Sequence, residues 1–186
     1  MAADAFVREG RPDDAGAVAR IQIHAWRRLY AQVVPARVLD ELTGAEAERR
    51  YTGHWRESME RPPTGRHRLL VAVQPSGDDG ERTADIAGFA SVGPAGDDDR
   101  WPRTDAEVYE FHVAPDHARQ GHGSRLVNAV ADTLRDDLFG TAVIWVPDSD
   151  TVTTGFLESS GWRPDGARRQ IDMGATITMS RLHTAL

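Results

Sequence analysis

Cysteine and lysine are both missing from this 186-residue chain. Without cysteine the protein can form no disulfide, no thiolate metal site and no cysteine nucleophile. Without lysine it cannot contain the Gly-Lys-Ser or Gly-Lys-Thr sequence of a P-loop. The sequence also lacks a recognisable signal peptide and any long apolar run. We therefore expect a protein that acts in the cytoplasm.

Positive charge is scarce as well. The chain carries 22 basic side chains against 29 acidic ones, which gives a formal net charge of -7. Nucleic acids and anionic membranes bind basic surfaces, so we expect neither as a partner, whereas a cationic substrate is mildly favoured. The hydrophobic content of 40% and the charged content of 27% are ordinary globular values. This length predicts a single domain over residues 1–186.

The most informative stretch runs from Glu107 to Asn128. Its first part, up to Val113, is rich in β-branched and aromatic residues, which is typical of a largely buried strand that Pro115 ends. An amphipathic helix follows. Its expected apolar stripe is Leu126, Val127, Val130, Leu134 and Leu138. Gly121 and Gly123 lie at the N-terminus of this helix, where the first backbone N–H groups have no hydrogen-bond partner inside the helix. This pattern predicts an anion site, with phosphate as the obvious ligand.

The spacing of the glycines narrows the choice of phosphate motif. A Rossmann motif would need a third glycine at the position of Leu126. The segments Phe111–Pro115 and Ala118–Gly123 instead resemble the pyrophosphate-binding motif of the GNAT N-acetyltransferase family, although Ala118 replaces the usual Gln or Arg. The resemblance covers nearly the whole chain. It implies a mixed α/β (α+β) fold with a central mixed sheet of about six to seven strands flanked by helices.

A GNAT-like chain would use acetyl-CoA (coenzyme A) as its co-substrate. The resemblance implies that the cofactor is held by Phe111, His112, Val113, Arg119, Gln120, Gly121, His122, Gly123, Ser124, Asp150 and Phe156. No metal is expected. His112, His117 and His122 are evenly spaced, but they lie on a strand end, a loop and a glycine turn, and they match no usual zinc spacing.

The acceptor is expected to be an amine, either of a small molecule or of a peptide or protein. Trp26 and Tyr30 are four residues apart and share a helix face. Residue type alone favours a place for both in the core, whereas the resemblance implies a wall of the acceptor pocket. The sequence does not determine the oligomeric state, and a homodimer is one option.

Catalysis must supply a neutral amine. An amine with a pKa near 10.4 is neutral in only about one molecule in several thousand at pH 7, so a nearby base is needed. Glu107 and Glu110 are the candidates. Strict alternation predicts that they lie on opposite faces of the strand, unless a bulge intervenes. The resemblance implies Glu107 as the base, because it corresponds to the general base of the histone acetyltransferase branch. The alternative is that Glu107 is a surface charge at the strand end. Leu157 occupies the position where many members of the family have a tyrosine that acts as the acid. Tyr109, Ser159 or water could protonate the thiolate instead, or the thiolate could leave without help.

Hydrophobic patterning predicts the remaining elements. We expect strands at 6–9, 69–73, 86–92, 142–146, 170–173 and 175–182, and helices at 15–30, from 38 or 46 to 56, and at 150–160. Gly140 is expected to end the helix after the glycine motif. Residues 74–85 and 93–104 are expected to be polar connections. The aspartates of the second connection favour a solvated loop over an acidic lip with Trp101 as a lid.

Two functions follow from this pattern. The first is an acyl-CoA-dependent N-acetyltransferase in which a primary amine attacks the thioester directly; a nucleophile other than an amine is a variant of it. The alternative is a non-catalytic module that senses CoA or acyl-CoA. Ala118 and Leu157 are the departures from the family pattern that support the alternative.

Overall fold

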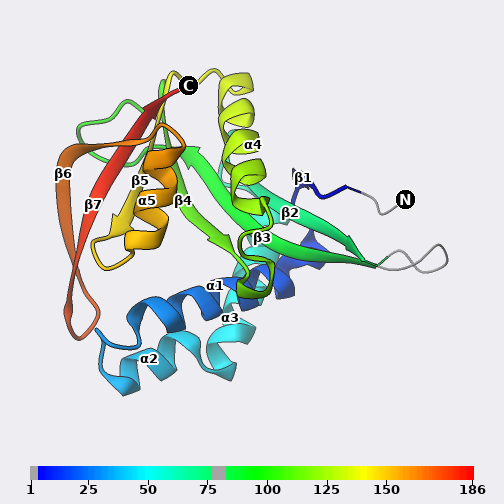
Figure 1. The fold of residues 1–186 in the computed structure, drawn as a ribbon, viewed down its shortest axis with the longest axis vertical. Coiled ribbons are helices and arrows are strands. Elements are labelled where there is room, and N and C mark those ends of the chain that lie inside the picture. Colours follow the sequence, from blue (N-terminus) through cyan, green and yellow to red (C-terminus); the bar gives the residue numbers. More distant parts are fainter. Residues whose placement is uncertain (1–3, 77–82) are drawn as a thin grey trace.

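A computed structural model describes residues 4–76 and 83–186 and shows a seven-stranded sheet in the order β1-β2-β3-β4-β5-β7-β6 (Figure 1). The strands are β1 (Phe6–Glu9), β2 (Arg68–Ser76), β3 (Thr83–Pro94), β4 (Asp105–Val113), β5 (Thr141–Pro147), β6 (Arg163–Asp172) and β7 (Thr176–Ala185). The α-helices are α1 (Ala15–Tyr30), α2 (Ala36–Thr43), α3 (Ala45–Glu60), α4 (His122–Asp136) and α5 (Thr151–Ser159). This is the mixed α/β fold that the sequence predicts.

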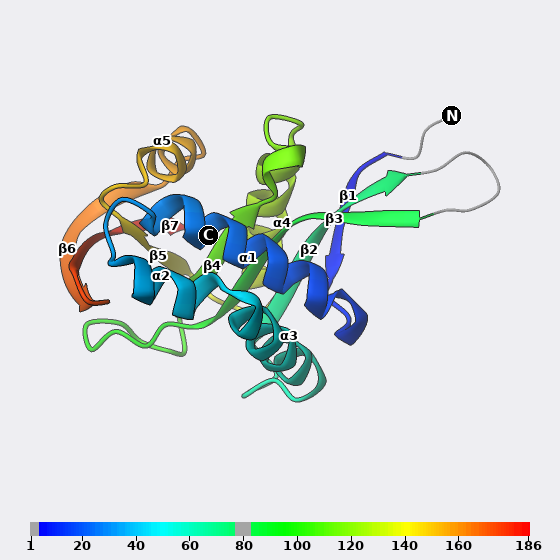
Figure 2. The same ribbon diagram turned by 90° about the horizontal axis from the view of Figure 1, so that it is seen from below.

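Helices cover both faces of the sheet. α4 and α5 lie on one face, and α1, α2 and α3 lie on the other (Figure 2). A large apolar cluster joins the α4 stripe to the sheet, and a second cluster joins α1 and α3 to β2 and β3. A smaller cluster, which includes Tyr30 and Met179, connects the end of α1 to β7. In the part of the chain that the structure describes, no helix is long and apolar enough to cross a membrane.

β4 and β5 separate halfway along their length. They pair in parallel only from Asp105–Val108 to Thr141–Ile144, although β4 continues to Val113 and β5 to Pro147. Beyond Val108 the edge of β4 that faces β5 has no strand partner. Backbone N–H and C=O groups on such an edge can bind an extended ligand. The separation therefore creates a gap in the middle of the sheet.

A β-bulge at Tyr109 changes the orientation of the residues that follow it. Ser91 pairs with Glu110 while the next residue, Val92, pairs with Val108, so Tyr109 has no partner across the ladder. An extra residue shifts the alternation of side chains by one position. As a result Glu107 and Glu110 line the same cavity. Strict alternation, which would place them on opposite faces, therefore does not hold, and the bulge that the sequence analysis allowed for is present.

The end of α4 also differs from the sequence expectation. Leu126, Val130 and Leu134 are buried as predicted, but the helix ends at Asp136. Leu138 has a left-handed φ of 63° and is 83% exposed, so it is not part of the stripe. Gly140, predicted to end the helix, donates its N–H to the carbonyl of Thr104 instead. The chain reverses because Leu138 takes the left-handed conformation that glycine more often supplies.

The loop between β3 and β4 is anchored to the sheet. Buried Arg181 of β7 donates to Asp97 at 2.7 Å and to Asp99 at 2.5 Å and 2.7 Å. Trp145 Nε1 also donates to Asp97 at 3.0 Å. The expectation of a freely solvated aspartate run is therefore wrong. Trp101 is 75% exposed and lines none of the cavities described below, so it is not a lid over them.

Other element boundaries differ more modestly. Two helices, α2 and α3, replace the single expected helical stretch, because Gly44 adopts an extended conformation between them. β2 and β3 extend to Ser76 and from Thr83, so both run into the predicted connection at 74–85. Residues 77–82 of that connection lie outside the described part. β6 begins at Arg163, earlier than the predicted 170–173.

Candidate active site

The glycine turn before α4 has the geometry of an anion site. Gly121 has a φ of 83°, which L side chains rarely adopt, and a Cβ there would lie 2.8 Å from Arg125 Nη1. Gly123 lies against the ring of Phe156, where a Cβ would come within 3.3 Å. The positive φ of Gly121 therefore favours glycine at that position, and the close approach of Phe156 leaves little room for a side chain at Gly123. The turn leaves the first N–H groups of α4 free to bind an anion.

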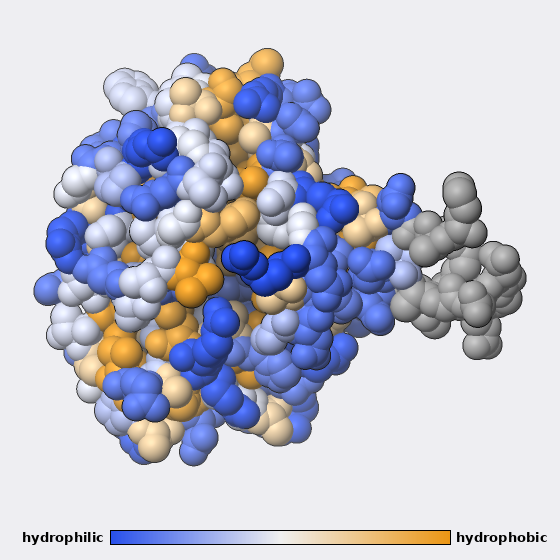
Figure 3. All heavy atoms as spheres, in the orientation of Figure 1, coloured by the Kyte–Doolittle hydropathy of each residue, from blue (hydrophilic) through white to orange (hydrophobic). Residues whose placement is uncertain are grey.

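A cavity of about 810 Å³ opens beside this turn, between α1, the end of β4, the start of α4, and α5. In the space-filling view of the orientation in Figure 1, apolar and hydrophilic side chains lie next to each other on this side of the molecule (Figure 3). We call this space the outer cavity. Nine of the predicted cofactor residues line it: Phe111, His112, Val113, Arg119, Gly121, Gly123, Ser124, Asp150 and Phe156.

Two predicted cofactor residues do not line the outer cavity. Gln120 turns away and donates its side-chain amide to the carbonyl of Asp116 at 3.0 Å. His122 is buried with 1% exposure, and neither ring nitrogen has a partner. Burial and the neighbouring His117 and Arg125 lower the pKa of His122, so its neutral form is favoured. Its buried ring packs against that of His117, so this side chain does not reach the outer cavity.

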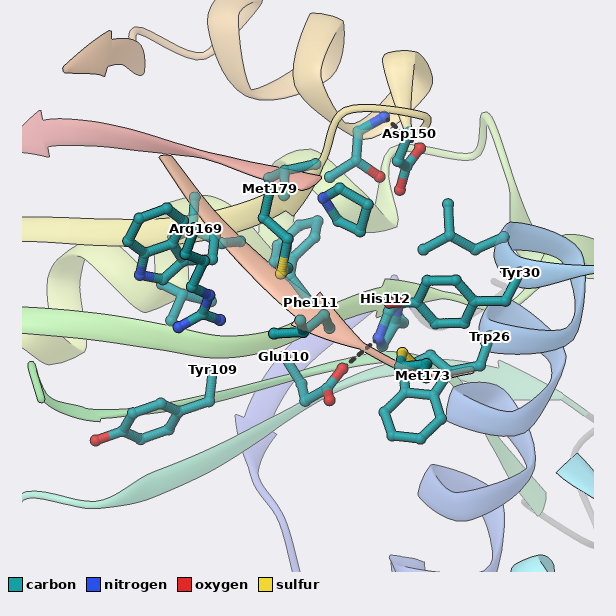
Figure 4. Close-up of a pocket in the computed structure, with 18 of the residues that line it drawn as sticks. Trp26, Tyr30, Tyr109, Glu110, Phe111, His112, Asp150, Arg169, Met173 and Met179 are labelled. Carbon is teal, nitrogen blue, oxygen red and sulfur yellow. Dashed lines mark hydrogen bonds and ion pairs between the residues drawn. The ribbon is translucent and has the colours of Figure 1, made fainter. Parts of the chain in front are cut away.

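A second cavity, of about 310 Å³, lies on the other side of β4 beneath α1 and the β6–β7 hairpin (Figure 4). We call it the inner cavity. Trp26 and Tyr30 both line it, and their rings make an edge contact at 6.4 Å. Burial, with Glu110 and Asp150 nearby, raises the pKa of Tyr30 to about 12. The two aromatic residues thus belong to the cavity wall and to the apolar cluster at once.

The two candidate bases differ in their surroundings. Glu107 is 9% exposed and accepts a long hydrogen bond of 3.4 Å from the backbone N–H of Gly96. Burial is the main cause that raises the pKa of this carboxyl, and nearby Asp97 adds to it. Glu110 accepts a hydrogen bond from Gln22 at 3.2 Å and lies 2.5 Å from Nε2 of His112. In Figure 4 the dashed line between Glu110 and His112 marks this last contact.

The candidates for the acid are less well placed. Tyr109 lines the inner cavity, but its hydroxyl donates to the carbonyl of Pro94 at 2.6 Å and its ring stacks on His67. Burial raises the pKa of Tyr109 to about 12. Leu157 is 1% exposed in the core, so its position faces away from the cavities. Ser159 lines the outer cavity and donates its hydroxyl to the carbonyl of Phe156.

The outer and inner cavities share a short stretch of wall. The residues that line both are Leu29, Phe111, His112, Asp150 and Thr153. The shared wall lies where β4 has separated from β5, past Val108. A ligand in the outer cavity can therefore reach a second ligand in the inner cavity through the gap in the sheet. This is the arrangement that a transfer between two bound molecules requires.

Several cavity residues gave no signal in the sequence. Arg169, Ile171, Met173 and Met179 reach the inner cavity from the β6–β7 hairpin, and Tyr51 reaches it from α3. Their types and spacing are those of ordinary strand and helix residues, so only the tertiary arrangement identifies them. Within residues 4–76 and 83–186, no group of three or more His, Asp or Glu side chains is placed to hold a metal ion.

Comparisons of the sequence and of the structure with known proteins both find N-acetyltransferases. The model of the acetyltransferase (GNAT) family matches residues 26–162. YuaI of Bacillus subtilis (strain 168), described as an uncharacterized N-acetyltransferase, is 26% identical over 140 residues, which are 75% of this chain and 70% of that protein.

Solved structures share the fold at low sequence identity. PaiA N-acetyltransferase from Thermoplasma acidophilum, in complex with coenzyme A, superposes with a TM-score of 0.66 at 12% identity and covers 99% of this chain and 100% of its own. YncA from Salmonella typhimurium, solved with its cofactor acetyl-CoA, has a TM-score of 0.67 at 17% identity. The match covers 99% of this chain and 95% of the YncA chain.

Proposed function

The chain belongs to the acetyltransferase (GNAT) family of acetyl-CoA-dependent N-acetyltransferases, and we propose that it transfers the acetyl group to a primary amine of a small molecule or peptide. The amine attacks the thioester directly, without an acetylated enzyme. This agrees with the absence of cysteine from the chain. The observation that carries the proposal is the meeting of two cavities at the gap between β4 and β5.

We place coenzyme A in the outer cavity. Its pyrophosphate binds the backbone N–H groups of residues 119–124, where the glycine turn and the start of α4 favour an anion. Its pantetheine arm pairs with the open edge of β4 at Phe111 and Val113, because β5 no longer occupies that edge. Arg119 lines the same cavity and can take over the phosphate contact that Ala118 does not supply.

We place the acceptor amine in the inner cavity. Trp26 and Tyr30 form its apolar wall, and Glu107 and Glu110 supply negative charge. An ammonium group is attracted by carboxylates and by the faces of aromatic rings. The same carboxylates can remove the proton that prevents attack on the thioester, either directly or through water. The chemistry of this cavity thus supports a cationic amine over a neutral or anionic acceptor.

The experiment that tests this function is the release of free thiol from acetyl-CoA. The protein is incubated with acetyl-CoA and a panel of primary amines that includes diamines, aromatic amines and short peptides. We expect thiol release that depends on at least one amine, with the acetylated product seen by mass spectrometry. Binding of coenzyme A without release for any amine would instead support a non-catalytic sensor.

The sensor remains the second candidate because the chain lacks the usual acid. Leu157 is buried, and the hydroxyl of Tyr109 already donates a hydrogen bond to the carbonyl of Pro94. An acid is not essential, however, since a thiolate of ordinary pKa near 8.5 can leave without one. We expect the protein to act in the cytoplasm. Size-exclusion chromatography with light scattering would distinguish a monomer from a homodimer.

A further inference from the structure

A chain of hydrogen bonds crosses the molecule from α3 to β4. Trp55 Nε1 donates to Gln22 Oε1 at 2.8 Å, and Gln22 Nε2 donates to Glu110 Oε1 at 3.2 Å. Glu110 Oε2 in turn lies 2.5 Å from Nε2 of His112. An indole N–H can only donate, so it fixes the orientation of the Gln22 amide and directs the amide N–H group at Glu110. Gln22 and Trp55 are 4% and 5% exposed, so this arrangement is held by buried groups.

The last two members of the chain connect three cavities. His112 lines both the outer and the inner cavity, and so lies where the thioester and the amine would meet. Glu110 lines the inner cavity and also a third cavity of about 480 Å³. This third cavity is bordered by α3, β2 and the segment Pro62–Pro63, and includes His54, Ser58 and His67. The pair therefore joins the reaction site to a separate opening.

We propose that His112 and Glu110 form a proton relay that deprotonates the acceptor ammonium and delivers its proton to the third cavity. The proposal rests on the function proposed above. Nε2 of His112 is engaged with Glu110, whereas no hydrogen bond among the described residues engages Nδ1. Nδ1 is thus the ring atom available to accept a proton. His112 is the catalytic residue that takes the proton from the amine, and Glu110 accepts the proton from His112. Gln22 and Trp55 are positioning residues.

The proton balance needs no additional reactant. An N–H bond of the ammonium breaks and an Nδ1–H bond of His112 forms, which leaves the amine with a lone pair for the thioester carbonyl. The Nε2 proton of the imidazolium moves to the Glu110 carboxylate, and from there to water in the third cavity. The ring is again neutral, with its proton now on Nδ1. Rotation or a second exchange with water restores the first tautomer.

Other charged and titratable groups surround the pair, and they set the field in which it works. Those that line the same cavities are Glu9 on β1, His24, Arg28 and Tyr30 on α1, Tyr51 and His54 on α3, His67 and Arg68 at the start of β2, Glu107 and Tyr109 on β4, Arg119 before α4, Asp150 beside α5, and Arg169 on β6. Glu107 lies in the part of β4 that still pairs with β5, opposite Val143. It is therefore farther along the strand from the gap, whereas Glu110 and His112 lie past the bulge.

The test compares His112→Gln, Glu110→Gln and the double variant with the wild type, using the best amine from the panel. We expect His112→Gln to lower kcat/KM by roughly 10²-fold, the usual contribution of a positioned base. The double variant should lose little more than His112→Gln alone, because the two residues act as a unit. Glu110→Gln should also lower kcat/KM, because the amide cannot accept the Nε2 proton of His112.

Matched controls separate this role from packing and from cofactor binding. His183→Gln on β7 alters a histidine that lines none of the three cavities and should leave kcat/KM within about twofold of wild type. Added imidazole should restore part of the activity of His112→Ala, as expected if a base is missing. Affinity for coenzyme A, measured by calorimetry, should fall much less than kcat/KM in His112→Gln.

Four results would overturn the relay. One is an active His112→Gln protein with an unchanged pH profile. Another is a loss of coenzyme A affinity in that variant as large as its loss of kcat/KM, which would make His112 a cofactor contact only. A larger loss in Glu107→Gln than in either relay variant would move the base to Glu107. A wild type that binds coenzyme A but acetylates no amine would instead refute the proposed function, and the relay with it.

Discussion

At the scale of single residues, the site depends on positions where one residue type meets a demand of geometry or charge. Gly121 supplies a left-handed turn beside the proposed phosphate site, and Glu107 keeps a carboxyl group in a poorly solvated place. The first demand is steric and the second electrostatic. Two substitutions test them separately.

Gly121→Asp should weaken coenzyme A binding at least tenfold. The substitution adds negative charge at the phosphate site and strains a backbone with a φ of 83°. Charge-assisted hydrogen bonds contribute roughly 1.5–3 kcal/mol each, so losing one is enough for this effect. Gly161→Asp is the matched control, because Gly161 also has a positive φ (94°) but lines none of the described cavities. Unchanged affinity in a folded Gly121→Asp protein would argue against the cofactor site.

Glu107→Gln should raise the melting temperature at neutral pH. Burial raises the pKa of Glu107 above its ordinary value of 4.5, so the folded state favours the protonated form. The stability that the protonated Glu107 contributes to the fold is fully present below pH 4.5. It is lost as the pH rises through the raised pKa and the buried carboxyl group becomes charged. The advantage of the glutamine variant should therefore disappear in acid. Thermal melts of the wild type and Glu107→Gln from acid to neutral pH measure this effect, and Glu158→Gln, at an exposed glutamate, is the control. If burial of Glu107 were not the cause, the difference in melting temperature between the two proteins would not change with pH.

At the scale of elements, each wall of the inner cavity comes from a different part of the chain. α1 supplies Trp26 and Tyr30, β4 supplies the carboxylates, and the β6–β7 hairpin supplies Arg169 and two methionines. The loop between β3 and β4 is held against this hairpin by Arg181. Substrate binding and loop anchoring can be tested independently.

Trp26→Ala should raise the KM of the amine much more than the KM of acetyl-CoA. Trp26 lines the inner and third cavities but not the outer one, and its ring contacts Tyr51 at 5.4 Å. Steady-state kinetics with each substrate varied in turn provides the comparison. Trp101→Ala, at an exposed tryptophan outside these cavities, should change neither value. Equal increases in both KM values would show that Trp26 serves the core only.

Arg181→Met should lower the stability of the fold at neutral pH by clearly more than the loss of a surface ion pair does, because it leaves the carboxylates of Asp97, Asp99 and Asp165 without their buried partner. The hydrogen bond from Arg181 lowers the pKa of Asp99 to about 2. The stability that such a carboxylate contributes is present above its ordinary value of 3.8 and is lost as the pH falls toward 2. The gap between variant and wild type should therefore narrow in acid.

Denaturant melts of Arg181→Met measure this effect, and Arg168→Met provides the control. Arg168 pairs with Asp148 at the surface, with its side chain 62% exposed, so its loss should cost no more than about 1 kcal/mol. A similarly small loss for Arg181→Met would mean that the loop is held by other contacts.

At the scale of the whole molecule, the sheet holds the two cavities on opposite sides of one gap. The ends of β4 and β5 are fixed by the large cluster around α4 and by the clusters around α1. A ligand that fills the outer cavity contacts α1, β4, α4 and α5 together. Its binding energy should therefore stabilise the fold as a unit.

Coenzyme A at 100 times its dissociation constant should stabilise the protein by about 2.7 kcal/mol, which is the mass-action value for one site. The melting temperature should rise with ligand concentration accordingly, as thermal shift or calorimetry can measure. Gly121→Asp should show little or no rise over the same concentrations, and Gly161→Asp should show the wild-type rise. An equal rise for Gly121→Asp would place the ligand elsewhere.

The sequence by itself determined the parts of this protein that depend on local chemistry. The glycine turn, the amphipathic helix after it and the apolar strands follow from backbone sterics and from hydrophobic period, which neighbouring residues decide. The same stretch indicated the family, and the absence of cysteine excluded a thiol nucleophile. Trp26 and Tyr30 could be named as candidates, but residue type did not decide between wall and core.

Only the tertiary structure decided what depends on residues far apart in the chain. The bulge at Tyr109 arises from the register of β4 against β3, and it places Glu107 and Glu110 in one cavity. Buried Arg181 binds aspartates more than 80 positions away, which a charge pattern along the chain cannot reveal. The contact of His112 with Glu110, fixed by Gln22 and Trp55, likewise joins three elements. Such contacts exist because packing brings distant groups together where water no longer competes for their hydrogen bonds.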